Sequence, residues 1–328
     1  MKLATYRVSG GSPRIGLVHD RDRRLFDLAA AAARAGADTA PFASMLALID
    51  ADEAGLDAAR ALFARRGGEE DLSLALAAVE LLAPLPEPRQ MRDGMTFPLH
   101  IRQGPRGMRR LAAGGNAEAL AAIEAEPLPE LAEVYRRIPI YYITNRLVVR
   151  GPGTTVRWPR YSQVMDYELE FGVVTRRRGV NIEAAAARDH IFGYTIFNDF
   201  SARDQQMIEM PGWLGPAKGK SFDGANVLGP WIVTPDEIGD PYRLAVAARV
   251  NGEVWSRGTT EGMLFSFEEM IAYISRDETV HPGEFIGSGT VGNGCGLEHG
   301  RFLQHGDEIE LDVERIGILK NRVERQDA

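Results

Sequence analysis

Polar and apolar residues alternate at the start of the chain in the way that is typical of half-buried strands. The runs LATYRV and RIGLVHD both show this period of two. Alanine-rich stretches follow at residues 25–35 and 42–66, and their composition and spacing predict helices. The proline-rich sequence at residues 84–88 cannot continue a helix and favours extended backbone, so it predicts a boundary. We therefore expect a small α+β domain over residues 1–83.

Short strand-like runs dominate the chain after this boundary. They include RLVVRG, YELEFGVV, YTIFND, GPWIVT, RLAVAARV and EIELDVERIG. Asn251 and Gly252 stand between two further runs of this kind and predict a tight hairpin. Residues 84–328 are accordingly expected to form one mostly β domain, which makes the whole chain α+β with strands in the majority.

Helices are expected at few places in the second domain. One is predicted at residues 182–188 with Asn181 as its N-cap, and another at residues 267–274, where Ser266 and Glu269 have capping-box spacing. Glycines, arginines and the segment AEALAAIEAE make residues 102–135 either an insertion over a site or a solvated excursion with a short helix.

Composition narrows the class of protein. The chain has 328 residues, of which 45% are hydrophobic and 26% are charged, so it is long enough to bury a sizeable core. Its 38 basic and 46 acidic residues give a net charge of −8, and no nucleic-acid partner is expected of a chain that repels polyanions. No apolar leader or membrane span is recognisable, and the single cysteine, Cys295, favours a reducing compartment, so a cytoplasmic location is expected.

The most informative run for chemistry is DYELEFG. In a strand, Tyr167, Leu169 and Phe171 share one face, and Glu168 and Glu170 share the other. Neighbouring carboxylates on a half-buried strand repel each other, so they need solvent, a shared proton or a cation. A hard divalent cation with oxygen ligands is the economical solution, although two glutamates on a solvated face would look the same in sequence.

Further polar residues follow the strand-like run YTIF. Asp199 stands at the end of that run and is a plausible third ligand. Arg203 and Lys220 are close by in sequence and either neutralise an anionic substrate or form ordinary salt bridges.

One motif invites a misleading interpretation. Residues 287–292, GSGTVG, match the dinucleotide-binding fingerprint, which requires a helix directly behind its third glycine. The next residues, NGCG, contain two more glycines and are not expected to open a stable helix, so a glycine-rich loop between strands is predicted instead. Cys295 lies in this loop and is expected to be a packing residue, not a nucleophile.

Taken together, four motifs resemble the fumarylacetoacetate hydrolase family in their order and separation. They are DYELEFG, GYTIFNDFSARDQQ, GKSFDGANVLGPW and GSGTVGNGCGLE. The resemblance covers about residues 84–325, and the N-terminal unit is similar to the extra domain of the longer members. It implies a mixed β-sandwich roll for the C-terminal domain, a Mg²⁺ or Mn²⁺ ion with Ca²⁺ as a further option, and a homodimer.

The resemblance also assigns roles to individual residues. In MRDGMTFPLHI, Asp93 stands seven residues before His100, which is the family's spacing between its first metal ligand and its catalytic histidine. The implied metal ligands are Asp93, Glu168, Glu170 and Asp199, the implied catalytic residues are His100, Glu298, Arg203, Gln206 and Lys220, and the implied substrate contacts are Tyr142 and Thr290.

These roles imply a metal-dependent hydrolase that cleaves a carbon–carbon bond in a β-diketo acid of the fumarylacetoacetate or acylpyruvate type, as in aromatic catabolism. His100 would act as general base towards water, and Glu298 would orient its imidazole. The sequence departs from the family at Met95 and Met210, where the namesake enzyme has aromatic residues, so its acyl-group pocket is expected to differ. Thr290 and Glu298 also stand closer together than in the namesake.

Two alternatives stay open at this stage. The same chelating site serves decarboxylases, isomerases, hydratases and lyases that act on a 2-oxo acid through a stabilised enolate. A binding protein that keeps the fold without catalysis is the second alternative, although four carboxylates kept together are costly in the absence of a function.

Overall fold

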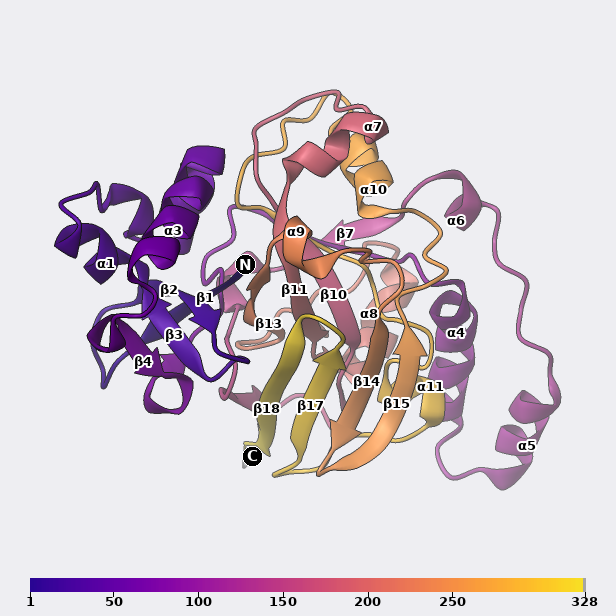
Figure 1. The fold of residues 1–328 in the computed structure, drawn as a ribbon. Coiled ribbons are helices and arrows are strands. Elements are labelled where there is room, and N and C mark those ends of the chain that lie inside the picture. Colours follow the sequence, from indigo (N-terminus) through magenta and orange to yellow (C-terminus); the bar gives the residue numbers. More distant parts are fainter. Residues whose placement is uncertain (327–328) are drawn as a thin grey trace.

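The computed structural model describes residues 1–326 and is organised around one large mixed sheet (Figure 1). The strand order is β4-β3-β2-β1-β13-β11-β10-β16-β6-β7, and β5 pairs with β1. The strands of this sheet are β1 (Lys2–Arg7), β2 (Arg14–His19), β3 (Arg24–Asp27), β4 (Ser73–Ala75), β5 (Glu80–Leu81), β6 (Met91–Gly94), β7 (Tyr141–Ile143), β10 (Leu169–Thr175), β11 (Ile191–Asp199), β13 (Asn226–Val233) and β16 (Phe285–Gly287).

A second, five-stranded sheet packs on one face of the large one. Its order is β15-β14-β17-β18-β8, and its strands are β8 (Thr155–Trp158), β14 (Ala245–Val250), β15 (Glu253–Thr259), β17 (Glu308–Val313) and β18 (Gly317–Arg325). The predicted hairpin at Asn251 and Gly252 is confirmed, because both residues have positive φ and join the antiparallel pair β14 and β15. A short pair, β9 (Met165–Asp166) and β12 (Ser201–Ala202), lies apart from both sheets.

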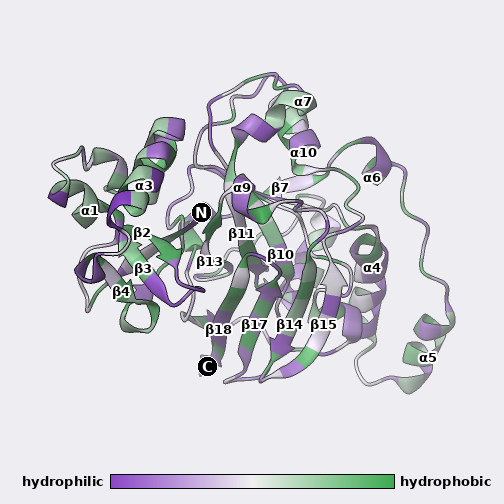
Figure 2. Ribbon diagram, in the orientation of Figure 1, coloured by the Kyte–Doolittle hydropathy of each residue, from purple (hydrophilic) through white to green (hydrophobic). Residues whose placement is uncertain are grey.

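The centre of the large sheet is covered on both faces. Every residue of β10, β11 and β13 is buried. Leu169 and Phe171 face the apolar cluster shared with the small sheet, whereas Val174 faces a second cluster shared with the N-terminal helices. This double burial explains why the runs in the middle of the chain are almost continuously apolar, as the green strands of Figure 2 show.

The helices lie around the edges of this sheet core (Figure 1). They are α1 (Leu28–Arg34), α2 (Met45–Asp50), α3 (Asp52–Arg66), α4 (Pro98–Ala113), α5 (Ala117–Ala125), α6 (Val134–Arg137), α7 (Ala184–Ala187), α8 (Arg203–Glu209), α9 (Pro235–Ile238), α10 (Phe267–Ile274) and α11 (Gly296–His299). Within the described residues, none of these helices has the length and apolar character needed to cross a membrane.

The N-terminal unit is joined to the rest of the molecule by backbone pairing as well as by packing. Strand β1 pairs antiparallel with β13, with Lys2 opposite Val233 and Leu3 opposite Ile232. The apolar cluster behind this junction contains Leu3 and Phe26 together with Phe285 of β16. The division of the chain at residues 83 and 84 stays a prediction, and the two units share one sheet and one core.

Of the predicted helix boundaries and caps, some are confirmed and others are wrong. The capping box of Ser266 and Glu269 at the start of α10 is confirmed. The first alanine-rich stretch begins as strand β3, because Leu25 and Phe26 pair with β2 and are buried there, and helix α1 starts only after Asp27, which caps it. The predicted N-cap at Asn181 is wrong: α7 begins at Ala184, and Asn181 has positive φ and bonds to Asp277 instead.

The segment that the sequence left as an insertion or an excursion contains most of helix α4, which has 16 residues and begins at Pro98. Pro105 and the glycines of α4 weaken its local helix propensity. Gly107 is nevertheless required where α4 packs on α11, because a Cβ atom there would collide with the backbone and side chain of Leu297. Tertiary packing therefore overrides local helix propensity at this position.

Candidate active site

Three carboxylates from three strands of the large sheet lie close together. Asp93 lies on β6, Glu170 on β10 and Asp199 at the last position of β11. One carboxylate oxygen of each lies within 4.8 Å of the others, and all three side chains are buried. Glu170 Oε2 and Asp199 Oδ1 are buried without a hydrogen-bond partner among the described residues. Unpartnered buried carboxylate oxygens in a group of three fit a hard divalent cation.

The pKa values of these three carboxyl groups are raised because the groups are buried close to one another. Burial raises the pKa of Asp93 to about 7, and the charge of Asp199 adds to this effect. Burial also raises the pKa of Asp199 to about 6, although Lys220 partly opposes the shift. The pKa of Glu170 is raised well above its ordinary value by burial and by the charge of Asp93. A cation among these side chains would relieve their repulsion.

Glu168, the fourth predicted ligand, lies between two cationic side chains. Lys220 Nζ donates to Glu168 Oε2 at 2.6 Å and also donates to Asp199 Oδ2. Arg203 Nη2 lies 2.7 Å from Glu168 Oε1. Burial opposes ionisation of Glu168, but Lys220 and Arg203 outweigh it and hold the pKa of this carboxyl below its ordinary value.

Arg203 lies at the start of α8 and is almost completely buried. Its Nε donates to Asp166 Oδ2 at 2.8 Å, and its Nη1 donates to Gln206 Oε1 at 2.9 Å. Asp166 also accepts hydrogen bonds from the backbone N–H groups of Gly296 and Leu297. The arginine that the sequence offered as a substrate contact is thus fixed by protein carboxylates, with Gln206 held beside it.

Asp166 is a residue that sequence reasoning missed. It is completely buried and connects α8 to the first residues of α11. The signal was present, because Asp166 opens the run DYELEFG, but an aspartate next to two glutamates is easily counted as one more surface acid.

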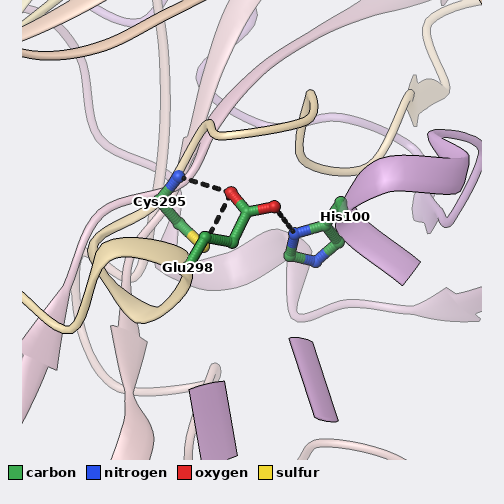
Figure 3. Close-up of side chains that lie close together, drawn as sticks. All are labelled: His100, Cys295 and Glu298. Atoms are coloured by element: carbon green, nitrogen blue, oxygen red, sulfur yellow. Dashed lines mark hydrogen bonds and ion pairs between the residues drawn. The ribbon is translucent and has the colours of Figure 1, made fainter. Parts of the chain in front are cut away.

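His100 lines the same pocket as these carboxylates, and with Glu298 it forms a second polar centre (Figure 3). His100 stands in the first turn of α4, and its Nδ1 lies 3.2 Å from Glu298 Oε1 on α11. The Cys295 backbone N–H donates to the other oxygen, Glu298 Oε2, at 3.1 Å, and the Cys295 Sγ lies 3.5 Å from it. The second ring nitrogen of His100 points away from Glu298 (Figure 3).

This pairing determines the state of the imidazole. Burial opposes charging of His100, but the Glu298 carboxylate outweighs it, so the pKa of His100 is raised above its ordinary value. A carboxylate on Nδ1 leaves Nε2 as the proton acceptor when the ring is neutral. The arrangement can accept a proton on one side of the ring and stabilise the resulting charge from the other.

Tyr142 and Thr290 also reach the carboxylates. The Tyr142 hydroxyl donates to Asp199 Oδ2 at 2.8 Å, and the Thr290 hydroxyl donates to Glu170 Oε1 at 3.1 Å. Burial and the charge of Asp199 raise the pKa of Tyr142 well above its ordinary value, which keeps the phenol protonated as a donor. All eleven predicted site residues therefore lie in one region.

The glycine-rich loop contacts the carboxylate group through its backbone. The Gly289 N–H donates to Asp93 Oδ1 at 3.2 Å. A side chain at Gly287 would collide with Asp93 Oδ1, and Gly289 combines positive φ with close approach to the backbone of Gly94. The loop after β16 is therefore built for backbone contact with Asp93. The single helical turn α11 does begin at Gly296, contrary to expectation, because the amides that open it bond to Asp166.

These groups line one cavity of about 280 Å³. Its polar wall comes from the strands and the glycine-rich loop, and its other wall comes from α4, α6, α8 and the segment that follows α8. The lining residues are Asp93, Gly94, Met95, His100, Ile101, Gly104, Pro105, Met108, Tyr135, Tyr142, Glu168, Glu170, Arg203, Gln206, Met210, Pro216, Lys220, Gly289, Thr290 and Leu297. We call this cavity the active-site pocket.

Comparisons with known proteins agree with this description. The chain is 39% identical over 187 residues to the mitochondrial oxaloacetate tautomerase FAHD2A of Homo sapiens, a match that covers 56% of this chain and 59% of the human protein. Its structure is similar to that of the fumarylacetoacetate hydrolase of Exiguobacterium antarcticum, with a TM-score of 0.70, 26% identity, and coverage of 99% of this chain and 100% of that chain.

A third similarity is to the fold of the maleylpyruvate hydrolase of a Sphingobium species, which was solved with manganese(II) and pyruvate. The TM-score is 0.69 at 21% identity, and the whole of each chain is covered. The family model described as "Fumarylacetoacetate (FAA) hydrolase C-terminal" matches residues 112–324, which is more than half of the chain. The predicted fold and resemblance are thereby confirmed, and the chain belongs to the fumarylacetoacetate hydrolase family.

Proposed function

We propose that this enzyme is a metal-dependent hydrolase that cleaves a carbon–carbon bond in a β-diketo acid of the fumarylacetoacetate or acylpyruvate type. The observation that carries the proposal is the pair of His100 and Glu298, with Nδ1 3.2 Å from Oε1, because His100 lines the same pocket as the buried carboxylates. Hydrolysis needs a base that activates water, whereas an enol–keto interconversion only moves a proton between oxygen and carbon.

The metal site of the proposal consists of Asp93, Glu170 and Asp199, with Glu168 as a fourth ligand. Mg²⁺ and Mn²⁺ suit such oxygen ligands, and Ca²⁺ would be accepted as well. When bound, the ion would polarise the keto oxygens of the substrate and stabilise negative charge that develops on them. The manganese in the complex of the Sphingobium enzyme, which has the same fold, supports this assignment.

The protein's own residues supply the remaining chemistry. His100 Nε2 takes a proton from water, and the water oxygen bonds to the acyl carbonyl carbon. The bond between this carbon and the neighbouring methylene carbon then breaks, and its electron pair stays on the methylene carbon as an enolate. The proton held by His100 is delivered to that carbon, which gives one carboxylic acid and one oxo acid. The oxo acid is pyruvate when the substrate is an acylpyruvate.

Several donors surround the developing charge. Lys220 and Gln206 are placed to donate to the enolate oxygen, and Arg203 holds Gln206 in position. The hydroxyls of Thr290 and Tyr142 are the proposed substrate contacts in the same wall.

We also propose a cytoplasmic location and a homodimer for this enzyme.

A second candidate is tautomerisation of a 2-oxo acid such as oxaloacetate. The human relative that is 39% identical over 187 residues is named as an oxaloacetate tautomerase. The two reactions share the enolate, and they differ in whether a carbon–carbon bond is cut.

The deciding experiment measures 2-oxo acid release instead of enol absorbance, because both reactions consume the enol. Metal-loaded enzyme is given a panel of 2,4-dioxo acids and oxaloacetate, and pyruvate is recorded with lactate dehydrogenase and NADH. We expect pyruvate from a dioxo acid, and a loss of about 10²–10⁴-fold in His100→Gln. Loss of enol absorbance without any pyruvate would overturn the hydrolase proposal in favour of the tautomerase.

A further inference from the structure

One face of helix α4 forms an apolar wall that leads away from the proposed base. His100, Ile101, Gly104, Pro105 and Met108 all line the active-site pocket, and their spacing places them on one side of the helix. Met108 stands eight residues after His100, which corresponds to about 12 Å along the helix axis. The pocket therefore extends for the length of several carbon–carbon bonds beyond the catalytic centre.

The rest of the outer half of the pocket, the part that lies beyond His100, is apolar as well. Leu297 of α11, Tyr135 of α6, and Met210 and Pro216 after α8 complete the lining there. Met210 is 43% exposed, so this part of the lining is open to solvent. Met108 and Met210 give this half a flexible, polarisable surface that suits carbon chains.

The charged side chains of the lining lie in the inner half of the pocket, close to the carboxylate group. Among the lining residues that the structure describes, the permanently charged cations are Arg203 and Lys220, and both are already paired with buried carboxylates. None of the four arginines of α4 is part of this lining. Arg102 and Arg106 donate to backbone carbonyls of residues 126–129. Arg109 pairs with Glu126, and Arg110 pairs with Glu124. A second carboxylate at the far end of a substrate would meet no cation of its own.

We propose that this outer half, defined by Ile101, Met108, Tyr135, Met210 and Leu297, binds an uncharged alkyl or aryl acyl group. The substrate is then a monocarboxylic 2,4-dioxo acid, and dicarboxylic dioxo acids are discriminated against. This inference rests on the proposed function, because it names the substrate class of the same site.

The physical basis is the unequal cost of burial. An alkyl chain gains free energy when it leaves water for this wall. A terminal carboxylate in the same place loses hydration without gaining an ion pair, although the open mouth lets it keep some water. We expect a preference of about 10- to 100-fold for the uncharged chain, which is the range that a single group in an apolar pocket produces.

A matched substrate pair tests the preference. The compounds 2,4-dioxoheptanoate and 2,4-dioxoheptanedioate have the same carbon skeleton and end in a methyl and a carboxylate group, respectively. Their kcat/KM values are compared with the metal-loaded full-length enzyme by pyruvate release. Equal values, or a preference for the dicarboxylate, would overturn the inference while leaving the hydrolase proposal intact.

A binding experiment separates the two proposals from the other direction. Calorimetry in the presence of Mn²⁺ compares 2-oxohexanoate with 2-oxoadipate, which again differ only in their terminal group and need no catalysis. We expect 2-oxohexanoate to bind at least tenfold more tightly. If neither dioxo acid releases pyruvate and this preference persists, the hydrolase proposal fails and the apolar subsite stands. Equal binding of the two acids would overturn the subsite.

Substitution then locates the determinant. Met108→Lys supplies the missing cation and is expected to reverse the preference towards the dicarboxylic compounds. Leu111→Lys adds the same charge one turn further along α4, outside the pocket lining, and is expected to keep the wild-type preference. Thermal unfolding of both variants checks that the fold is retained. An unchanged preference in a folded Met108→Lys variant would contradict the assignment of this wall.

Discussion

The two halves of the active-site pocket are built from different kinds of element. The inner half takes Asp93, Glu170 and Asp199 from three strands, β6, β10 and β11, of a sheet that is covered on both faces. The outer half takes its side chains mainly from α4 and from the segment after α8, at the edge of the molecule (Figure 1). Strand backbone fixes charged groups rigidly where their spacing matters, whereas peripheral helices can vary in shape without disturbing those groups.

His100 belongs to both halves. Its backbone is part of α4, but its ring is held by Glu298, and Glu298 is held in turn by the Cys295 amide in the loop that serves the carboxylates. The position of the base relative to the inner half therefore depends on how α4 packs against α11. The comparison predicts large chemical effects for changes in the inner half and smaller, graded effects for changes along α4.

The largest effect is expected from Glu170→Gln. This substitution keeps the shape of the side chain and the acceptor for Thr290 but removes one charge, so we expect kcat to fall by about 10³-fold or more, together with a large loss of Mn²⁺ affinity in calorimetry. The raised pKa of Glu170 means that its ionised form opposes folding. The metal-free variant should therefore melt at the same temperature as the wild type or ~2 °C higher.

The exposed Glu124→Gln, which changes the same residue type outside the pocket, serves as the control for both measurements. A metal-free Glu170→Gln variant that melts well below the wild type would show that the carboxylate group is not under electrostatic strain.

The next effect concerns Glu298→Gln and the pH dependence of catalysis. A general base must be neutral, so the rate falls as the pH falls through the pKa of His100. Glu298 raises that pKa, and its removal leaves burial, which lowers it. The acid limb of the kcat/KM profile should therefore move to lower pH, while kcat at the optimum drops by about 10²-fold. An acid limb that stays in place would show that another group controls it.

The smallest effects are expected from two glycines of α4. Gly107→Ala places a methyl group against Leu297 and should shift α4, with a cost of about 1–3 kcal/mol in the free energy of unfolding and a reduced kcat. Gly104→Ala adds a methyl group in open space on the same helix and should stabilise the protein by about 0.5–1 kcal/mol. Denaturant unfolding of both variants measures these values.

Similar stability for the two variants would mean that the contact between α4 and α11 yields easily. The proposed base, His100, would then be less firmly positioned relative to the inner half of the pocket than we infer.

Much of the inner half was predictable from residue patterns. Alternation along DYELEFG placed Tyr167, Leu169 and Phe171 on one face, and they lie in one apolar cluster. The same alternation put Glu168 and Glu170 on the other face, and both line the pocket. Periodicity succeeds here because neighbouring strands constrain side-chain direction along the whole run.

The outer half was much less predictable. Pro105 and Gly107 weaken the local helix propensity of the segment that becomes α4. Gly107 is nevertheless needed for the close packing of α4 against Leu297. Likewise, the pairing of Arg203 with Asp166 and Glu168 depends on contacts between segments far apart in sequence. No spacing rule indicates that such an arginine is already neutralised.

By itself the sequence determined the α+β class, the family and the identity of the carboxylates, because these follow from periodicity and from motifs that are local in the chain. Only the tertiary structure decided which carboxylates stand close together, which one lies between Lys220 and Arg203, and that an apolar wall continues beyond His100. Local order along a chain fixes the direction of a side chain, but its charge state and its neighbours depend on burial, which is a property of the whole fold.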